Sequence, residues 1–166
     1  TLVVGCQRDV YRFTEGGVYG TTYHVSYRSD TDYDAEIRQE MERVNQSLSM
    51  FNKNSVISKW NRGESDQVDS LFIAMYTKAK EVNQVTGGAF DITVAPLVNV
   101  WGFGFKNEKL PSAEKVDSLL RYVGMDKVQL DGDRVIKQVE GIQMDASSIA
   151  KGQGVDLVAE FFDRNG

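Results

Sequence analysis

The chain has 166 residues, of which 41% are hydrophobic and 26% are charged, a composition typical of one globular domain. Its formal net charge of -5 argues against a nucleic-acid partner, because no basic surface is available to neutralise a phosphate backbone. A single cysteine and a single histidine exclude an internal disulfide and Cys-rich zinc or iron–sulfur sites.

Residues 1–6 have the pattern that ends a bacterial lipoprotein signal. The letters L-V-V-G-C at residues 2–6 place apolar residues and one small residue before a cysteine. We therefore expect Cys6 to be lipidated and the protein to be anchored on the periplasmic side of a bacterial cell envelope. The alternative is an apolar N-terminal strand in which the Cys6 thiol is buried.

Residues 7–166 predict one domain that begins with a β-hairpin. Strands are expected at 11–13 and 18–27, with Gly16 and Gly17 making the turn. Alternation in the second strand places His24 on the face opposite Tyr23 and Tyr27. We therefore interpret His24 as a solvated or hydrogen-bonded histidine and not as a catalytic base.

Two amphipathic helices are predicted next, at 33–47 and 69–85, separated by a polar segment and a short turn at 55–60. Gly87 can end the second helix in the left-handed conformation. Their apolar positions are interpreted as core and not as cofactor contacts: Ile37, Met41, Val44 and Leu48 in the first helix, and Leu71, Phe72, Met75, Ala79 and Val82 in the second.

Residues 86–105 combine four glycines with four aromatic residues and few charges. Paired glycines let a backbone approach a ligand closely, and aromatic rings offer flat apolar surface. Neither the dinucleotide fingerprint G-x-G-x-x-G nor a P-loop is present. The alternative interpretation is a glycine-rich turn into a core helix that begins at Pro96.

The rest of the chain predicts a helix at 112–123, strands at 128–130 and 135–137 joined by a turn, a strand at 142–144 and a last helix to about residue 163. Asn165 and Gly166 resemble a helix cap that leads into a further strand. We therefore expect the chain to be a fragment.

Residues 145–156 are the most informative stretch. Asp145 closes the expected strand, Ser147 or Ser148 can cap the following helix, and Lys151 falls in its first turn. A helix N-terminus with a nearby cation favours a phosphate, and an aspartate can help to hold a divalent cation. An ordinary strand followed by a capped helix is the alternative.

Short motifs follow one another along nearly the whole chain: V-V-G-C at 3–6, G-T-T-Y at 20–23, L-S-M-F at 48–51, S-V-I-S-K-W-N at 55–61, T-G-G-A-F-D-I-T at 86–93, P-L at 96–97, W-G-F-G at 101–104 and D-A-S-S-I-A-K-G-Q-G-V-D at 145–156. In this order they resemble the N-terminal half of the ApbE-type FAD:protein FMN transferases. The resemblance implies an α+β fold, with a mixed or antiparallel sheet, packed helices and a T-fold-like core, of which 7–166 is the N-terminal portion.

The resemblance also implies site residues. Rings at Tyr19, Phe51 and Phe90 would enclose the flavin, and Lys151 would contact the cofactor. Ser148 would contact a metal through its carbonyl or hydroxyl. The full implied cofactor-binding set is Tyr19, Phe51, Ala89, Phe90, Asp91, Asp145 and Lys151.

Three positions depart from the family pattern. Tyr19 stands where a methionine is usual, Phe51 replaces a tyrosine, and 146–148 read A-S-S where many members read L-G-G. The family's catalytic residues and remaining metal ligands are expected in a C-terminal half that lies outside this sequence.

The implied activity is Mg²⁺-dependent transfer of FMN from FAD to a threonine of an acceptor protein, with release of AMP. Two alternatives are a FAD pyrophosphatase that yields FMN and AMP, and a non-catalytic FAD-binding surface lipoprotein. All of these require the two stretches around Asp91 and Asp145 to share one cleft.

Overall fold

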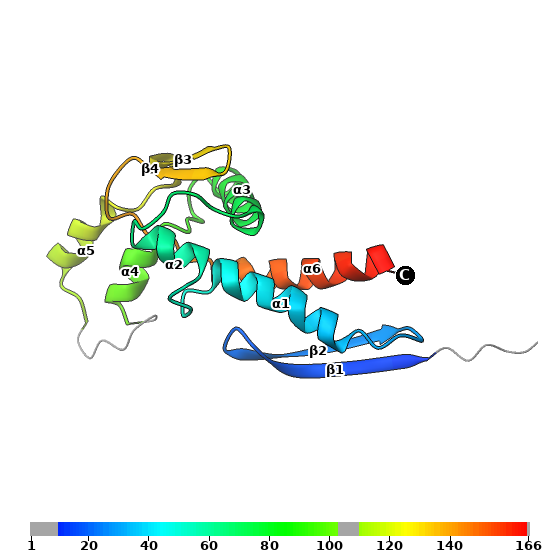
Figure 1. Cartoon of the computed structure of the whole chain (residues 1–166). Coiled ribbons are helices and arrows are strands. Elements are labelled where there is room, and N and C mark those ends of the chain that lie inside the picture. Colours follow the sequence, from blue (N-terminus) through cyan, green and yellow to red (C-terminus); the bar gives the residue numbers. More distant parts are fainter. Residues whose placement is uncertain (1–9, 103–109, 166) are drawn as a thin grey trace, which may run out of the picture.

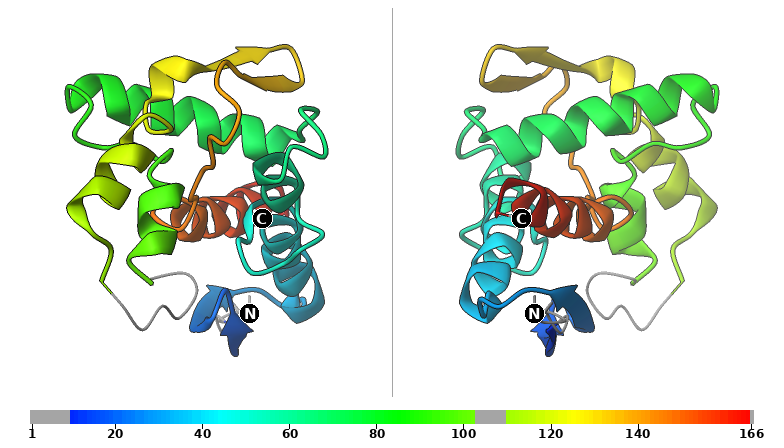
Figure 2. Two further views of the ribbon diagram at one scale, coloured as in Figure 1. Left: turned by 90° about the vertical axis from the view of Figure 1, so that its left-hand side faces the viewer. Right: turned by 90° about the vertical axis from the view of Figure 1, so that its right-hand side faces the viewer.

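The computed structural model describes residues 10–102 and 110–165, so the predictions for Cys6 and for 103–105 lie outside the described residues. Within these ranges the fold is α+β, as expected. Two antiparallel hairpins lie at opposite ends of the molecule, with helices between them (Figures 1 and 2). No helix in the described ranges is long and apolar enough to cross a membrane.

The first hairpin pairs β1 (Tyr11–Val18) with β2 (Thr21–Arg28). The expected turn at Gly16 and Gly17 is wrong, because both glycines pair within the ladder. The turn is instead formed by Tyr19 and Gly20, whose φ angles of 53° and 72° suit a two-residue turn that matches the strand twist. The absence of a side chain at Gly16 lets the Tyr23 ring lie close to the backbone, since a Cβ added there would lie 2.9 Å from Cε1 of Tyr23.

His24 is solvated and has a polar partner, as expected. Its imidazole is on the outer face of the hairpin with 73% of the side chain exposed, and its Nδ1 lies 3.1 Å from a carboxylate oxygen of Glu15. Tyr23, Val25 and Tyr27 are on the inner face, as expected, and pack toward the helices. An exposed histidine with one surface carboxylate as its partner is a poor candidate for a catalytic base.

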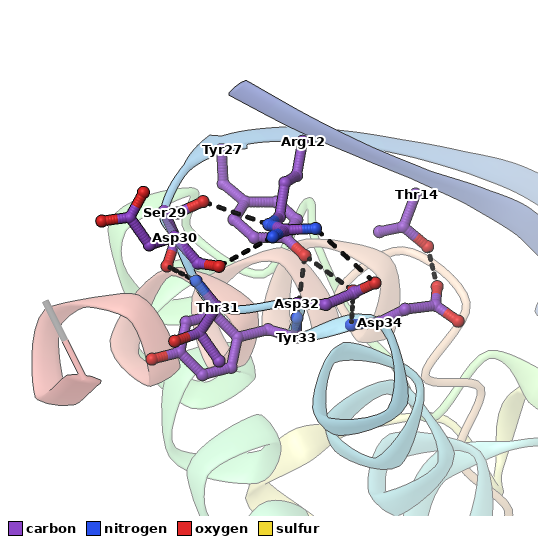
Figure 3. Close-up of polar contacts among 9 residues, drawn as sticks. All are labelled: Arg12, Thr14, Tyr27, Ser29, Asp30, Thr31, Asp32, Tyr33 and Asp34. Carbon is purple, nitrogen blue, oxygen red and sulfur yellow. Dashed lines mark hydrogen bonds and ion pairs between the residues drawn. The ribbon is translucent and has the colours of Figure 1, made fainter. Parts of the chain in front are cut away.

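A polar network fastens this hairpin to the start of α1 (Asp34–Leu48) (Figure 3). The guanidinium of Arg12 donates to the carbonyl of Asp30 at 2.7 Å and lies 3.8 Å from the Asp32 carboxylate. The hydroxyl of Tyr27 accepts from the backbone N–H of Tyr33 at 2.8 Å. These bonds fix the direction of the hairpin relative to α1, and with it the position of the Tyr19 turn.

Two long helices, α1 and α6 (Ala150–Asn165), lie side by side across the inner face of the hairpin (Figure 1). The predicted stripe of α1 is confirmed, since Ile37, Met41, Val44 and Leu48 are all buried. Ile37 and Met41 pack with Val158 of α6 in one apolar cluster. The two helices therefore place the loop after α1 near the start of α6.

The second hairpin and α3 form the other end of the molecule. The predicted turn at 55–60 is a helix, α2 (Val56–Asn61), capped by the hydroxyl of Ser55. Asp69 caps α3 (Ser70–Val85), and Gly87, with φ of 61°, follows its end as predicted. The remaining elements are α4 (Ala95–Val100), α5 (Ala113–Leu120), η1 (Met125–Lys127), β3 (Val128–Asp131) and β4 (Arg134–Lys137).

The expected strand at 142–144 is not a strand. Its apolar residues are buried, but Gln143 forms only an isolated parallel bridge with Val94. The backbone of Met144 is instead paired by the side chain of Asn61, which accepts from its N–H at 2.8 Å and donates to its carbonyl at 2.9 Å. A side-chain amide therefore takes the place of a neighbouring strand just before Asp145.

Candidate functional site

Two hollows meet at the N-terminal end of α6. The smaller is lined by the end of α1, by residues 49–51 and by the start of α6. The larger, of about 520 Å³, lies between the inner face of the first hairpin and α6. Tyr19 and Lys151 line both. Three predicted site residues from distant parts of the chain, Tyr19, Phe51 and Lys151, therefore lie around one region.

Tyr19 stands between the two hollows. Its hydroxyl donates to the carbonyl of Met41 at 2.7 Å, and its ring packs against Gly154 of α6. Burial raises the pKa of the Tyr19 phenol well above its usual range, and the carboxylate of Glu42 adds to this. The phenol therefore stays neutral, so it can offer a ring face but not a proton acceptor.

Phe51 and Lys151 supply the accessible groups of this region. The Phe51 side chain is 74% exposed, which leaves its ring free to stack on a ligand. Lys151 is exposed in the first turn of α6, where its ammonium and the positive end of the helix dipole both favour an anion. An aromatic face and a cationic group thus stand at the same hollow.

Asp145 organises the turn into α6. Its Oδ1 accepts from the backbone N–H of Ser147 at 2.8 Å and from the Ser147 hydroxyl. Ser147 therefore does not act as the expected cap, because Asp145 is the acceptor and Ser147 the donor; a cap by Ser148 stays a prediction. The backbone N–H of Asp145 donates to the carbonyl of Ile92 at 2.8 Å, which joins the two informative stretches of the chain.

The donors at this turn have the chemistry that Mg²⁺ prefers. Oδ2 of Asp145 has no partner among residues 10–102 and 110–165, and Ser148 is exposed three positions further on. Oxygen ligands suit a small hard cation. Within the described ranges, however, no group of three or more acidic, histidine or cysteine side chains gathers to hold a metal. These oxygen donors suit Mg²⁺ in kind, but a bound ion would need further ligands.

Asp91 has both carboxylate oxygens in use. Oδ1 accepts from the backbone N–H of Thr93 at 2.8 Å and from its hydroxyl at 2.5 Å, while Oδ2 accepts from the N–H of Met125 at 3.1 Å. Through these bonds Asp91 holds the start of η1. A hydrogen bond from FAD to Asp91 stays a prediction. Such a bond would compete with the bonds that Asp91 accepts from Thr93 and Met125.

Ala89 and Phe90 lie on the turn after α3, where Gly87 and Gly88 both have positive φ. Ala89 is exposed, and Phe90 is half-buried against the main core with its carbonyl accepting from Asn83 at 2.7 Å. Neither of the two hollows at α6 is lined by these residues, by Asp91 or by Asp145. The stretches are adjacent, but their sharing of a cleft stays a prediction.

Comparison with known proteins agrees with the family resemblance. The model of the ApbE family matches residues 19–166. This chain belongs to the ApbE family. A FAD:protein FMN transferase from Haemophilus influenzae is 35% identical over 95% of this chain, and one from Vibrio cholerae is 31% identical over 99%.

Solved ApbE structures have the same fold. The flavin transferase ApbE from Vibrio cholerae has a TM-score of 0.88 at 30% identity and covers 95% of this chain. The apo form of the Pseudomonas stutzeri flavinyl transferase ApbE has a TM-score of 0.89 at 28% identity and covers 98%. The chain spans about half the length of these relatives, between 51% and 55%.

Sequence reasoning missed two residues that hold this candidate site together: Asn61 fixes the backbone before Asp145, and Gly154 admits the ring of Tyr19. Ser147 was expected as a cap, whereas its hydroxyl donates to Asp145. The D-x-S spacing at 145–147 is a recognisable turn signal. Asn61 and Gly154 act on partners far along the chain, which no local pattern reveals.

Proposed function

We propose that this chain is the flavin-binding portion of an FAD:protein FMN transferase, which moves FMN from FAD to a threonine of an acceptor protein and releases AMP. The observation that carries the proposal is the meeting of Tyr19, Phe51 and Lys151 around the start of α6. The names of the relatives support the same activity. Because the chain spans about half of each relative, the complete activity belongs to the longer protein.

In this proposal the rings of Tyr19 and Phe51 bind the flat isoalloxazine system of FAD, and Lys151 contacts the phosphates of FAD. Asp145 and Ser148 would hold Mg²⁺ together with ligands from the other half of the protein. The ion would neutralise charge on the diphosphate oxygens during the displacement. The bonds from Asp145 to Ile92 and to Ser147 keep the carboxylate in place, which is the positioning that such a reaction requires.

We further propose that Cys6 carries the lipid that holds the protein to the envelope membrane on its periplasmic side, where acceptor redox proteins would be flavinylated. Stable anchoring requires two or more acyl chains. Mass spectrometry of the protein from membranes should find acylated Cys6, and a Cys6→Ser variant should appear in the soluble fraction. Unmodified Cys6 in the mature protein would contradict the lipid anchor and leave the flavin chemistry untouched.

Titration of the full-length protein with FAD and Mg²⁺ tests the binding site. Lys151→Met should weaken FAD binding by about 10-fold or more, since a charge-assisted hydrogen bond contributes about 1.5–3 kcal/mol. Phe51→Ala should weaken it by about 3- to 10-fold through lost stacking. The matched controls are Lys78→Met, on an exposed surface of α3, and Val85→Ala, whose side chain is 84% exposed; neither should change the affinity.

Incubation with FAD and a threonine-containing acceptor tests the reaction. Covalent flavin on the acceptor together with AMP supports the transferase. AMP and FMN without acceptor modification would identify a pyrophosphatase, and binding without either product a flavin carrier. Residues 1–166 alone should bind FAD weakly, and a sub-micromolar affinity for them would contradict the view that half of the site lies elsewhere.

A further inference from the structure

Gly154 lies inside a helix, where its backbone conformation does not require a glycine. It lies buried in α6, in ordinary helical geometry, where glycine is less favourable than alanine. A Cβ atom added at this position would lie 3.0 Å from Oη of Tyr19, 3.2 Å from Cε2 and 3.5 Å from Cζ. Carbon atoms in good contact are about 3.5–4.0 Å apart, so a methyl group here would force the ring to move.

Tyr19 has little freedom to move away. It occupies the hairpin turn with φ of 53°, a left-handed conformation that costs a non-glycine residue energy. Its hydroxyl is bonded to the carbonyl of Met41 on α1 at 2.7 Å. The ring is therefore held on one side by α1 and on the other by the bare backbone of Gly154 on α6.

This ring is also the wall between the two hollows, since Tyr19 lines both of them together with Lys151. A shift of the Tyr19 ring toward the hairpin would narrow the larger hollow and widen the smaller one. The placement of Tyr19 thus sets the space that a flat ring finds beside Lys151. Gly154 also lines the larger hollow, next to the Tyr19 ring.

We infer that Gly154 is a positioning residue for Tyr19: the missing side chain at 154 lets the Tyr19 ring stand between α1 and α6, and so fixes the boundary between the smaller hollow, lined by Phe51 and Lys151, and the larger one. The effect on ligand binding rests on the proposed flavin site, whereas the packing of Tyr19 on Gly154 does not.

The test compares Gly154→Ala with Gly152→Ala in the full-length protein. Both place a methyl group in the same helix, but a Cβ at 152 meets no atom within 4 Å. Gly152→Ala should raise the melting temperature by about 2–4 °C, because alanine favours the helix. Gly154→Ala should lower it by a similar amount or more, and should weaken FAD binding by about 10-fold while Gly152→Ala leaves the affinity unchanged.

Rescue by Tyr19→Phe separates positioning from general damage. Removing Oη removes the atom nearest to the added methyl group, and it also removes the bond to Met41. Tyr19→Phe alone should therefore lower the melting temperature, yet in the Gly154→Ala background it should restore part of the lost stability and of the lost FAD affinity. Two losses that simply add would overturn the inference.

The two failures can be distinguished. Absence of FAD binding by the wild-type protein would refute the proposed function, and the melting temperatures would still test the Tyr19–Gly154 pair. Coupled melting temperatures with an unchanged FAD affinity in Gly154→Ala would overturn the claim that the pair sets the boundary between the two hollows. Equal melting temperatures for the two alanine variants would overturn the pair itself.

Discussion

Asn61→Ala tests how the backbone before Asp145 is held. The Asn61 amide makes two hydrogen bonds with Met144, at 2.8 Å to its N–H and 2.9 Å to its carbonyl, and the Met144 side chain is fully buried. Alanine leaves both backbone groups without a partner. Each unsatisfied group costs about 1–3 kcal/mol, and partial access of water reduces the sum. We expect the free energy of unfolding to fall by about 2–4 kcal/mol.

Urea-induced unfolding, followed by tryptophan fluorescence, measures this loss. Trp60 is 1% exposed and immediately precedes Asn61, so its emission reports the opening of this region. The matched control is Asn45→Ala, whose amide nitrogen contacts the Glu42 carboxylate on the surface of α1. That variant should differ from wild type by about 0.5 kcal/mol or less. A loss below about 1 kcal/mol for Asn61→Ala would refute the reasoning.

Three further predictions concern single side chains. Asp69→Ala should cost about 1–2 kcal/mol of unfolding free energy, because its carboxylate caps α3 through the N–H of Phe72 and accepts from Ser47; urea unfolding checks this against Ser112→Ala, an exposed cap. Gly16→Ala should cost about 1–3 kcal/mol through overlap with Tyr23, whereas Gly17→Ala, with its nearest atom at 3.8 Å, should cost less. Burial lowers the pKa of Lys137 from its ordinary 10.5 to about 8. The unfolded chain therefore binds more protons than the folded chain between these pH values, and the free energy of unfolding should rise from about pH 8 to 10.5. Urea unfolding at pH 7.5 and 9.5 should show this rise in the wild-type protein and not in Lys137→Met.

Periodicity in the sequence predicts the helices well, because their burial pattern is local. The stripe from Ile37 to Leu48 is buried as predicted, and the helices expected from 69 and from 112 begin one residue later, at Ser70 and Ala113. The hairpin turn was misplaced because a Gly-Gly pair is the stronger turn signal, and the need for Gly16 arises from Tyr23 across the strand pair. The segment at 142–144 is apolar like a strand, yet its partner is one amide from α2.

The candidate site was only partly predictable for the same reason. The turn at 145–147 is local, and the acidic residue and serines that form it stand out in the sequence. The hollow beside Lys151 requires the hairpin turn, the loop after α1 and the start of α6 to meet, and their positions came from resemblance to a family. Gly154 shows the limit most clearly, since its importance depends on a ring 135 positions earlier in the chain.

The pairing of α1 with α6 has a consequence for biosynthesis. Ile37 and Met41 are covered by Val158, yet about 100 residues separate the end of α1 from the start of α6. At about 5–20 residues per second, a ribosome needs roughly 5–20 s to deliver the covering helix. Throughout that interval the hairpin can pack on Ile37 and Met41, but the face of α1 that Val158 covers stays open, where a holding chaperone could bind until α6 has emerged.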